Sequence, residues 1–278
     1  MQLCVGRVPF LVCAPYFHRF FQSETLKSRF LFDDGVPSAL NSLLSEGKIH
    51  LAPASSFNYA LHPDKFVLYS ELCTSCHLEV HSVRLYSKEP IENLGGKSVH
   101  LTSNSATSVA LLKVLFSLCY HVEPRYVVER PYDAHLDKAR LLIGDEALLE
   151  NRKNDFPYVY DLASLWQNWQ GLPFVFGAWS IHYTALESPL VQELSDFLRE
   201  VRLSVTQFRE SPRLALECWK RHYPVDIPIE DLQAYFNALD YTFTAERKKS
   251  LKLFFEKCLE IGLLSSTPPM KYWAPDFI

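Results

Sequence analysis

Short apolar segments of strand length alternate with longer amphipathic segments over most of the chain. An apolar segment at Ser98–Leu101 is followed by the helical pattern Ala106–Leu118, and Leu141–Ile143 leads through Gly144 into another helix. A strand followed by a covering helix, repeated in this way, is typical of parallel sheets with helices packed on them. The pattern therefore predicts an α/β fold.

The remaining elements follow from the same periodicities and from the positions of proline and glycine. Further strands are predicted at Gln2–Val8, Ile49–Ala52, Phe66–Tyr69, Val83–Tyr86, Tyr126–Glu129, Tyr158–Tyr160 and Phe174–Ile181. Further helices are predicted at Val36–Gly47, around Asp133–Ala139, and at Asp161–Trp169, Glu187–Phe208, Ser211–His222, Ile229–Leu239 and Thr244–Leu264. Residues 9–15 are predicted to form a turn, and everything after Glu187 is predicted to be helical.

A cluster of hydroxyl side chains precedes the predicted helix at Ala106. It comprises Thr102, Ser103, Ser105, Thr107 and Ser108. One hydroxyl suffices to cap a helix, and the unpaired N–H groups of a helix start also suit an anion. Both interpretations stay open for this turn taken alone. A second hydroxyl turn, Ser55-Ser56, and the turn Gly144-Asp145 also follow predicted strands, and ligands of open α/β sheets bind at such strand ends. The sequence thus predicts a small-ligand cleft between two lobes.

Composition narrows the functional classes. The 278 residues carry a formal net charge of −4 and no long basic run, which argues against nucleic acid as a partner. Apolar runs stay short of the roughly 20 residues of a membrane span. Arg7 and Pro9 interrupt the apolar N-terminal segment, which lacks the features of a signal peptide. The odd number of cysteines, seven, favours reduced thiols in the core. We expect a soluble protein of the cytoplasm.

Cys73-Thr-Ser-Cys76-His77 has the spacing of a covalent haem attachment motif, and with Glu79 and His81 it offers zinc ligands. Haem attachment requires an exported protein, and a structural zinc site needs a second ligand pair that the sequence lacks. A redox role is also disfavoured because the pair does not open a long helix. We interpret the two cysteines as surface thiols beside a strand and expect no metal. The acidic pairs Asp33-Asp34 and Asp145-Glu146 fit helix-dipole or capping roles better than acid–base catalysis.

Five segments together resemble the chorismate dehydratase family of the futalosine route to menaquinone. The segments begin at Val36-Pro-Ser-Ala-Leu-Asn, Ala54-Ser-Ser-Phe-Asn, Leu101-Thr-Ser-Asn-Ser-Ala-Thr-Ser-Val, Leu141-Leu-Ile-Gly-Asp and Tyr160-Asp-Leu, the last running on to Gly171-Leu-Pro-Phe174. They occur in the family's order, and the resemblance covers about Val5 to Phe255.

The resemblance implies a two-lobed type II periplasmic-binding-protein-like fold that works as a cytoplasmic lyase. Lobe one would comprise residues 1–87 and 176–278, including the helical C-terminal segment, and lobe two residues 88–175. Chorismate would lose water in the closing cleft to give 3-[(1-carboxyvinyl)oxy]benzoate, without cofactor or metal and with assistance from the substrate's own enolpyruvyl group. By position, Ser105, Ala106, Thr107, Ser55, Ser56, Gly144 and Asp145 match substrate-binding turns, and Ser82 matches a catalytic serine.

The chain departs from the family pattern in its first turn. The family has an asparagine at the position of Val12, and valine neither donates nor accepts a hydrogen bond. Gln170 also replaces a threonine before Gly171-Leu-Pro. The resemblance therefore leaves a second interpretation, a catalytically impaired protein that binds a small carboxylate in the same cleft. A third is the naphthoate-forming enzyme of the same pathway, from which the Trp166/Trp169 pattern departs.

Overall fold

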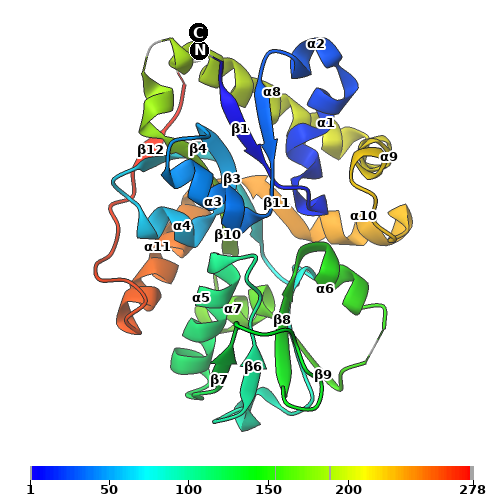
Figure 1. Cartoon of the computed structure of the whole chain (residues 1–278), viewed down its shortest axis with the longest axis vertical. Coiled ribbons are helices and arrows are strands. Elements are labelled where there is room, and N and C mark those ends of the chain that lie inside the picture. The colour runs from blue at the N-terminus through cyan, green and yellow to red at the C-terminus, as the bar shows by residue number, and fades with distance from the viewer. Residues whose placement is uncertain (1, 154, 188, 276–278) are drawn as a thin grey trace.

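Two β-sheets divide the chain into two lobes, one above the other in Figure 1. The structure is a computed structural model that describes residues 2–153, 155–187 and 189–275. The larger sheet has the strand order β11-β4-β10-β3-β1-β2, with β12 paired to β4. Its strands are β1 (Cys4–Arg7), β2 (Leu31–Asp34), β3 (Leu51–Ser55), β4 (Phe66–Cys76), β10 (Phe174–His182), β11 (Leu239–Thr242) and β12 (Tyr272–Trp273).

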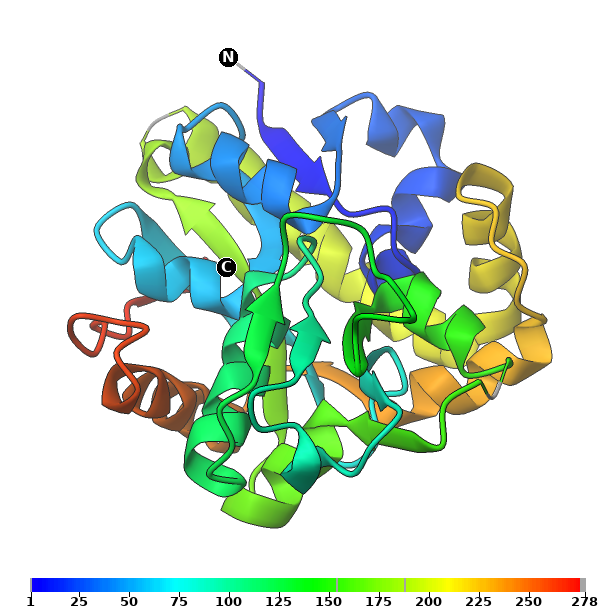
Figure 2. The same cartoon turned by 60° about the horizontal axis from the view of Figure 1, so that its bottom comes forward.

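The smaller sheet has the order β7-β6-β8-β5-β9. Its strands are β5 (Val83–Ser87), β6 (Ser98–His100), β7 (Arg125–Val127), β8 (Ala139–Ile143) and β9 (Tyr158–Asp161). Figure 2 brings this lobe forward and shows its strands and helices grouped together. Because β5 pairs with β8 and β9, the chain changes sheets before Val83. We therefore propose that lobe two starts at Val83, five residues before the start predicted from the sequence.

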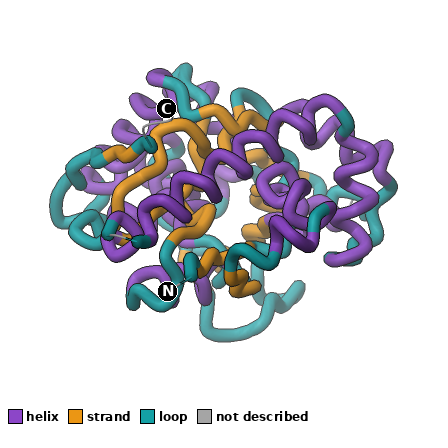
Figure 3. The backbone as a smooth tube through the Cα atoms, turned by 90° about the horizontal axis from the view of Figure 1, so that it is seen from above, coloured by secondary structure: helices purple, strands orange, loops and turns teal. Residues whose placement is uncertain are grey.

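Helices cover the strands of both lobes, and from above they flank the strands on more than one side (Figure 3). The structure has α1 (Ala14–Gln22), α2 (Glu24–Lys27), α3 (Pro37–Ser45), α4 (Ser56–Leu61), α5 (Ala106–Val114), α6 (Gly144–Glu150), α7 (Leu162–Gln170), α8 (Leu190–Glu210), α9 (Pro212–His222), α10 (Ile229–Ala238) and α11 (Ala245–Glu260). Within the described part of the chain, no helix combines the length and apolarity that crossing a membrane requires.

Antiparallel pairing makes both sheets mixed. Strand β10 runs antiparallel to β3 and β4, and β5 runs antiparallel to β8 and β9. The expected parallel pairs are present elsewhere, as in β1 with β2 and β3 and in β6 with β7 and β8. The antiparallel strands arise where the chain crosses between lobes, from β4 to β5 and back from α7 to β10. The crossings bring the strand ends of the two lobes face to face.

Two predictions of secondary structure are wrong, and a third is too long at one end. The turn predicted for residues 9–15 contains a 3₁₀ turn, η1 (Leu11–Cys13), but ends at Cys13, because α1 follows directly with Pro15 in its first turn. The helix predicted around Asp133–Ala139 is a turn that leads into β8, held by Asp137, which accepts hydrogen bonds from both terminal nitrogens of Arg130 and from Asp133 N. The C-terminal part is not wholly helical, because β11 and β12 add strands to the larger sheet.

The core of the larger lobe is rich in aromatic rings. Tyr16, Phe17 and Phe20 on α1 are fully buried, and they pack against Trp179 of β10 and Phe197 of α8. Aromatic side chains bury large apolar areas, so this cluster stabilises the lobe strongly. It also fixes α1 and the preceding turn η1, which reaches the space between the lobes.

Candidate active site between the lobes

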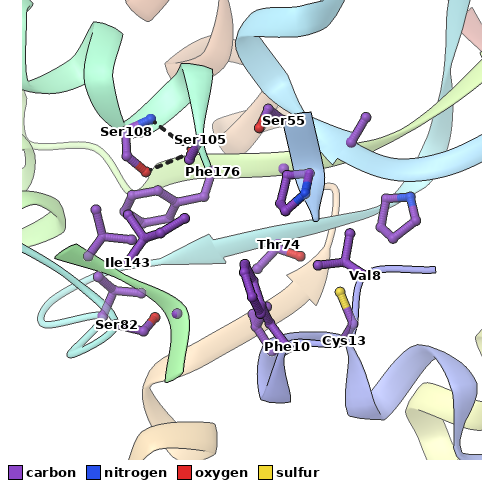
Figure 4. Close-up of a pocket in the computed structure, with 18 residues that line it drawn as sticks. Val8, Phe10, Cys13, Ser55, Thr74, Ser82, Ser105, Ser108, Ile143 and Phe176 are labelled. Atoms are coloured by element: carbon purple, nitrogen blue, oxygen red, sulfur yellow. Dashed lines mark hydrogen bonds between the residues drawn. The ribbon is translucent and has the colours of Figure 1, made fainter. Parts of the chain in front are cut away.

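A cavity that is partly open to solvent lies between the lobes and is lined by residues of both sheets. Figure 4 shows Ser105, Ser108, Phe176, Ile143 and Ser82 on one side of it, opposite other wall residues. Most of the wall is apolar, with Val8, Phe10, Val12, Val80, Val83, Ile143 and Phe176. The polar lining groups are the hydroxyls of Ser55, Thr74, Ser82, Ser105 and Ser108. Among the described lining residues there is no charged side chain.

Helix starts from both lobes meet at this cavity. Ser55 precedes α4, Ser105 precedes α5, and Gly144 is the first residue of α6, and all three line the wall. The Ser105 hydroxyl accepts a hydrogen bond from Ser108 N at 3.2 Å and lies 3.0 Å from the Ser108 hydroxyl. Helix starts carry unpaired N–H groups and a partial positive charge. The dipoles of these helix starts therefore favour an anion in the cavity without a basic side chain, while the N–H groups of Ser108 and Gly144 are already paired within the chain.

Ser56 and Thr107 come together from opposite lobes but do not line the cavity. Both side chains are fully buried. The Thr107 hydroxyl accepts a hydrogen bond from Phe57 N at 3.0 Å and lies 3.3 Å from the Ser56 hydroxyl, which donates to Val175 O. These bonds hold the start of α4 against the start of α5. In this arrangement the two residues set the distance between two helix starts.

The Gly144-Asp145 turn also joins the lobes. Gly144 lines the cavity, has a positive φ of 59°, and donates its N–H to Ser82 O at 2.7 Å. The Asp145 carboxylate instead accepts a hydrogen bond from Leu11 N at 3.1 Å. Burial raises the pKa of Asp145 to about 6, with the Leu11 hydrogen bond acting in the opposite direction. Asp145 and Ala106 are not among the residues that line the cavity.

Val12 is among the residues that line the cavity. Its carbonyl oxygen accepts a hydrogen bond from the Tyr241 hydroxyl at 2.9 Å. Cys13 follows it in the wall, where burial raises the pKa of its thiol and the Asp145 carboxylate raises it further. A thiol of this kind stays protonated, so Cys13 is a poor nucleophile at neutral pH.

Sequence reasoning missed two groups of lining residues. Thr74 lies on β4, with its hydroxyl 2.9 Å from that of Tyr16. The predicted strand ends at Tyr69, whereas β4 continues to Cys76, so the sequence did not identify Thr74 as a strand residue at the cavity. Phe10, which lies in the predicted first turn, and Phe176, which lies in the predicted strand Phe174–Ile181, are also part of the cavity wall. Ring walls of this kind suit a ligand with a flat apolar ring.

Among the described residues, the motif at Cys73 does not bring three potential metal ligands together. Cys73 and Cys76 are fully buried in β4, so the prediction of surface thiols is wrong. Burial raises the pKa of both to about 12, and all seven cysteines are free. Their strand lies inside the larger sheet, between β10 and β11.

Among the described residues, one group of side chains has the spacing of metal ligands, namely Glu79, His81 and Asp161. The Arg84 guanidinium already pairs with all three, at 2.9 Å from Glu79, 2.6 Å from His81 Nδ1 and 3.2 Å from Asp161. Asp161 also accepts hydrogen bonds from Val80 N and His81 N. A cation is thus supplied by the chain itself, and the cluster stabilises the loop before β5.

Comparisons of the sequence and the fold with known proteins identify relatives of this chain. One relative, a chorismate dehydratase of Thermus thermophilus, is 35% identical over 185 residues, covering 60% of this chain and 66% of that protein. A chorismate dehydratase of Campylobacter jejuni is 24% identical over 263 residues, covering 93% of this chain and 98% of that protein.

The periplasmic aliphatic sulphonate binding protein of Escherichia coli superposes with a TM-score of 0.69 at 12% identity, over all of this chain and 93% of that one. This likeness confirms the predicted periplasmic-binding-protein-like α/β fold. A family model described as menaquinone biosynthesis matches residues 3–260, nearly the whole chain. The chain belongs to this menaquinone biosynthesis family.

Proposed function

We propose that this protein is a carbon–oxygen lyase that dehydrates chorismate to 3-[(1-carboxyvinyl)oxy]benzoate in menaquinone biosynthesis by the futalosine route. The observation that carries the proposal is the cavity between the lobes, with helix starts from both lobes and an apolar, partly aromatic wall. Chorismate has two carboxylates on a cyclic, largely apolar frame. Its two anionic groups and its ring match the two kinds of surface that this cavity offers.

The chemistry is redox-neutral and balances without a co-reactant. The ring C–H bond beside the ether oxygen breaks, its electron pair completes the aromatic ring, and the neighbouring C–O bond breaks to release hydroxide. The substrate's enolpyruvyl group takes up the ring proton and passes it to the hydroxide, which leaves as water. Because aromatisation drives the reaction, the protein needs mainly to orient the substrate, exclude water and stabilise the departing hydroxide.

The composition of the wall supports assistance by the substrate. None of the described lining residues is an aspartate, glutamate, histidine or lysine that would serve as a base. In our proposal the enolpyruvyl group accepts the ring proton. The hydroxyl of Ser82 donates a hydrogen bond to the departing oxygen, and the starts of α4 and α5 hold the carboxylates. We further propose action in the cytoplasm, since a reducing compartment suits seven free cysteines, and cell fractionation tests this.

The test is incubation of the purified protein with chorismate, followed by liquid chromatography and mass spectrometry. A product 18 mass units lighter than chorismate, with the ultraviolet spectrum of a substituted benzoate, is expected. The variant Ser82→Ala is the matched control and should form the product more slowly. Absence of product from folded, monodisperse wild-type protein would contradict the proposal.

Val12 favours a second candidate, a protein that binds a small carboxylate in this cavity without turnover. Its aliphatic side chain occupies a wall position where the family implies a hydrogen-bonding amide. Calorimetry distinguishes the candidates. Binding of chorismate without product supports the second one, particularly if Val12→Asn then forms the product. Conversion by the wild type excludes it.

A further inference from the structure

A buried tyrosine outside the cavity wall contacts one of the cavity's hydroxyls. Tyr235 lies on α10 of the larger lobe and is 3% exposed. Its hydroxyl donates a hydrogen bond of 3.1 Å to the Ser82 hydroxyl oxygen, just before β5 of the smaller lobe. Ser82 itself is 4% exposed and lines the cavity. The bond therefore links α10 of the larger lobe to the loop that leads into the smaller lobe.

The direction of this bond leaves the serine proton for a ligand. A hydroxyl has one proton to donate and two lone pairs to accept with. Burial raises the pKa of Tyr235, so the phenol stays protonated and remains a donor over the whole working range of pH. Within the described residues, the Ser82 hydroxyl has no acceptor for its own proton. Accepting from Tyr235 thus orients the Ser82 proton away from the tyrosine.

The position of Ser82 is restrained through its main chain as well. Its carbonyl accepts a hydrogen bond from Gly144 N at 2.7 Å, and its N–H donates to Val80 O at 2.7 Å. With the main chain held, the rotamer of the side chain and the rotation of the hydroxyl are the freedoms that remain. The hydrogen bond from Tyr235 restrains both.

The tyrosine ring also lines a second cavity. This cavity lies between α6 and α10, and its other lining residues include His81, Asn151, Arg152 and Asp231. Ser82 lines the first cavity and not this one. A phenylalanine in place of Tyr235 keeps this wall and removes only the hydroxyl, so the two contributions are separable.

We propose that Tyr235 is a positioning residue that orients the Ser82 hydroxyl toward the bound ligand. The inference rests on the proposed function for its readout and goes beyond it by assigning a role to a residue outside the cavity wall. If the protein dehydrates chorismate, the oriented Ser82 hydroxyl donates its hydrogen bond to the departing hydroxide. Preorganised donors of this kind act on the transition state more than on the bound substrate.

The experiment is a double-mutant cycle on steady-state turnover of chorismate, with kcat and KM determined separately. Tyr235→Phe should lower kcat by roughly 3- to 10-fold, the range expected for one hydrogen bond, and leave KM within about twofold. Ser82→Ala should lower kcat about 100-fold, the size of effect found for a single oxyanion donor. Adding Tyr235→Phe to Ser82→Ala should then cause no further loss, because the orienting group has nothing left to orient.

Tyr59→Phe is the matched control. Tyr59 is also fully buried, and its hydroxyl donates to Pro269 O and accepts from Lys271 N, away from the cavity lining. Its removal should lower the melting temperature without changing kcat. An equal loss from Tyr235→Phe in the wild-type and Ser82→Ala backgrounds would show independent action and overturn the inference.

The outcome stays interpretable if the proposed function fails. Should the wild type bind chorismate without turnover, the same cycle is measured as dissociation constants by calorimetry. Should chorismate neither bind nor react, the proposed function is wrong, and the cycle is measured in urea unfolding. Non-additivity between Tyr235→Phe and Ser82→Ala would then support the orienting bond, and additivity would refute it.

Discussion

The carboxylate of Asp145 gives this protein a specific dependence of stability on pH. It lies in the first turn of α6 and accepts a hydrogen bond from Leu11 N across the two lobes. Burial raises its pKa from 3.8 to about 6, so desolvation outweighs the hydrogen bond that favours the charged form. The perturbation is Asp145→Asn, which keeps an oxygen acceptor for Leu11 N and removes the charge.

The magnitude follows from the difference between the folded and unfolded pKa values. A raised pKa in the folded state contributes stability that is fully present below about pH 3.8 and is lost as the pH rises through about 6. Each unit of pKa corresponds to about 1.4 kcal/mol, so ionised Asp145 costs at most about 3 kcal/mol at pH 7.5. About 2 kcal/mol of this cost arises between pH 4.5 and pH 7.5. The asparagine variant does not incur it.

The assay is thermal unfolding of wild type and Asp145→Asn between pH 4.5 and pH 7.5, followed by circular dichroism. For a chain of this length 1 kcal/mol shifts the melting temperature by about 2 °C. We expect the variant to melt about 5 °C higher at pH 7.5 and about 2 °C higher at pH 4.5. Glu146→Gln is the control, since it removes the exposed neighbouring carboxylate from the same helical turn. A variant that tracks the wild type at a constant offset across this range would refute the reasoning.

Three further predictions concern the walls of the cavity and the contacts behind them. Val12→Asn should raise the rate of product formation from chorismate, measured by mass spectrometry, because it adds a hydrogen-bonding amide to an aliphatic wall; an unchanged rate would exclude that role. Thr107→Val should lower the free energy of unfolding in urea by about 1–3 kcal/mol, since it leaves the buried Phe57 N–H unpaired; a value near zero would contradict the interlobe bond. Gly144→Ala should lower the melting temperature, because the positive φ of 59° costs an alanine about 1–2 kcal/mol and its Cβ would lie 3.2 Å from Phe10 Cδ2; an unchanged melting temperature would show that the turn relaxes.

Much of the fold was predictable because its signals are local. Helix α3 has Pro37 in its first turn and Gly47 with a positive φ just beyond its end, as the sequence suggested. Ser105 does cap α5, with its hydroxyl accepting from Ser108 N. Signals of this kind depend on residues three or four positions apart, which the sequence displays directly.

Other elements depended on partners distant in the chain. Strand β4 continues from Tyr69 to Cys76 because β10 and β11 pair with it from either side. Leu239, the last residue of a predicted helix, begins β11 for the same reason. Pairing with the free edge of β4 outweighs the modest helical preference of Leu239. The local sequence around Leu239 contains no information about that distant edge.

The candidate site likewise combines features that the local sequence predicts with features that depend on contacts between distant residues. Its turns were predictable, since hydroxyls and glycines after strands are a sequence feature, and Ser55, Ser82, Ser105 and Gly144 all line the cavity. The roles within the site were not predictable. Ser56 and Thr107 carry the same hydroxyl groups but bond each other behind the wall, a distinction made by how the two lobes meet.

The class of fold, the family and the turns around the cavity follow from the sequence, because each rests on short-range patterns or on residues in a known order. Which side chains act together follows from the packing of the two lobes. Tyr235 lies 153 positions from Ser82 and reaches it only because α10 of one lobe packs beside the loop that opens β5 of the other. A hydrogen bond acts over about 3 Å, and distance along the chain carries no information about such a contact until the lobes are folded against each other.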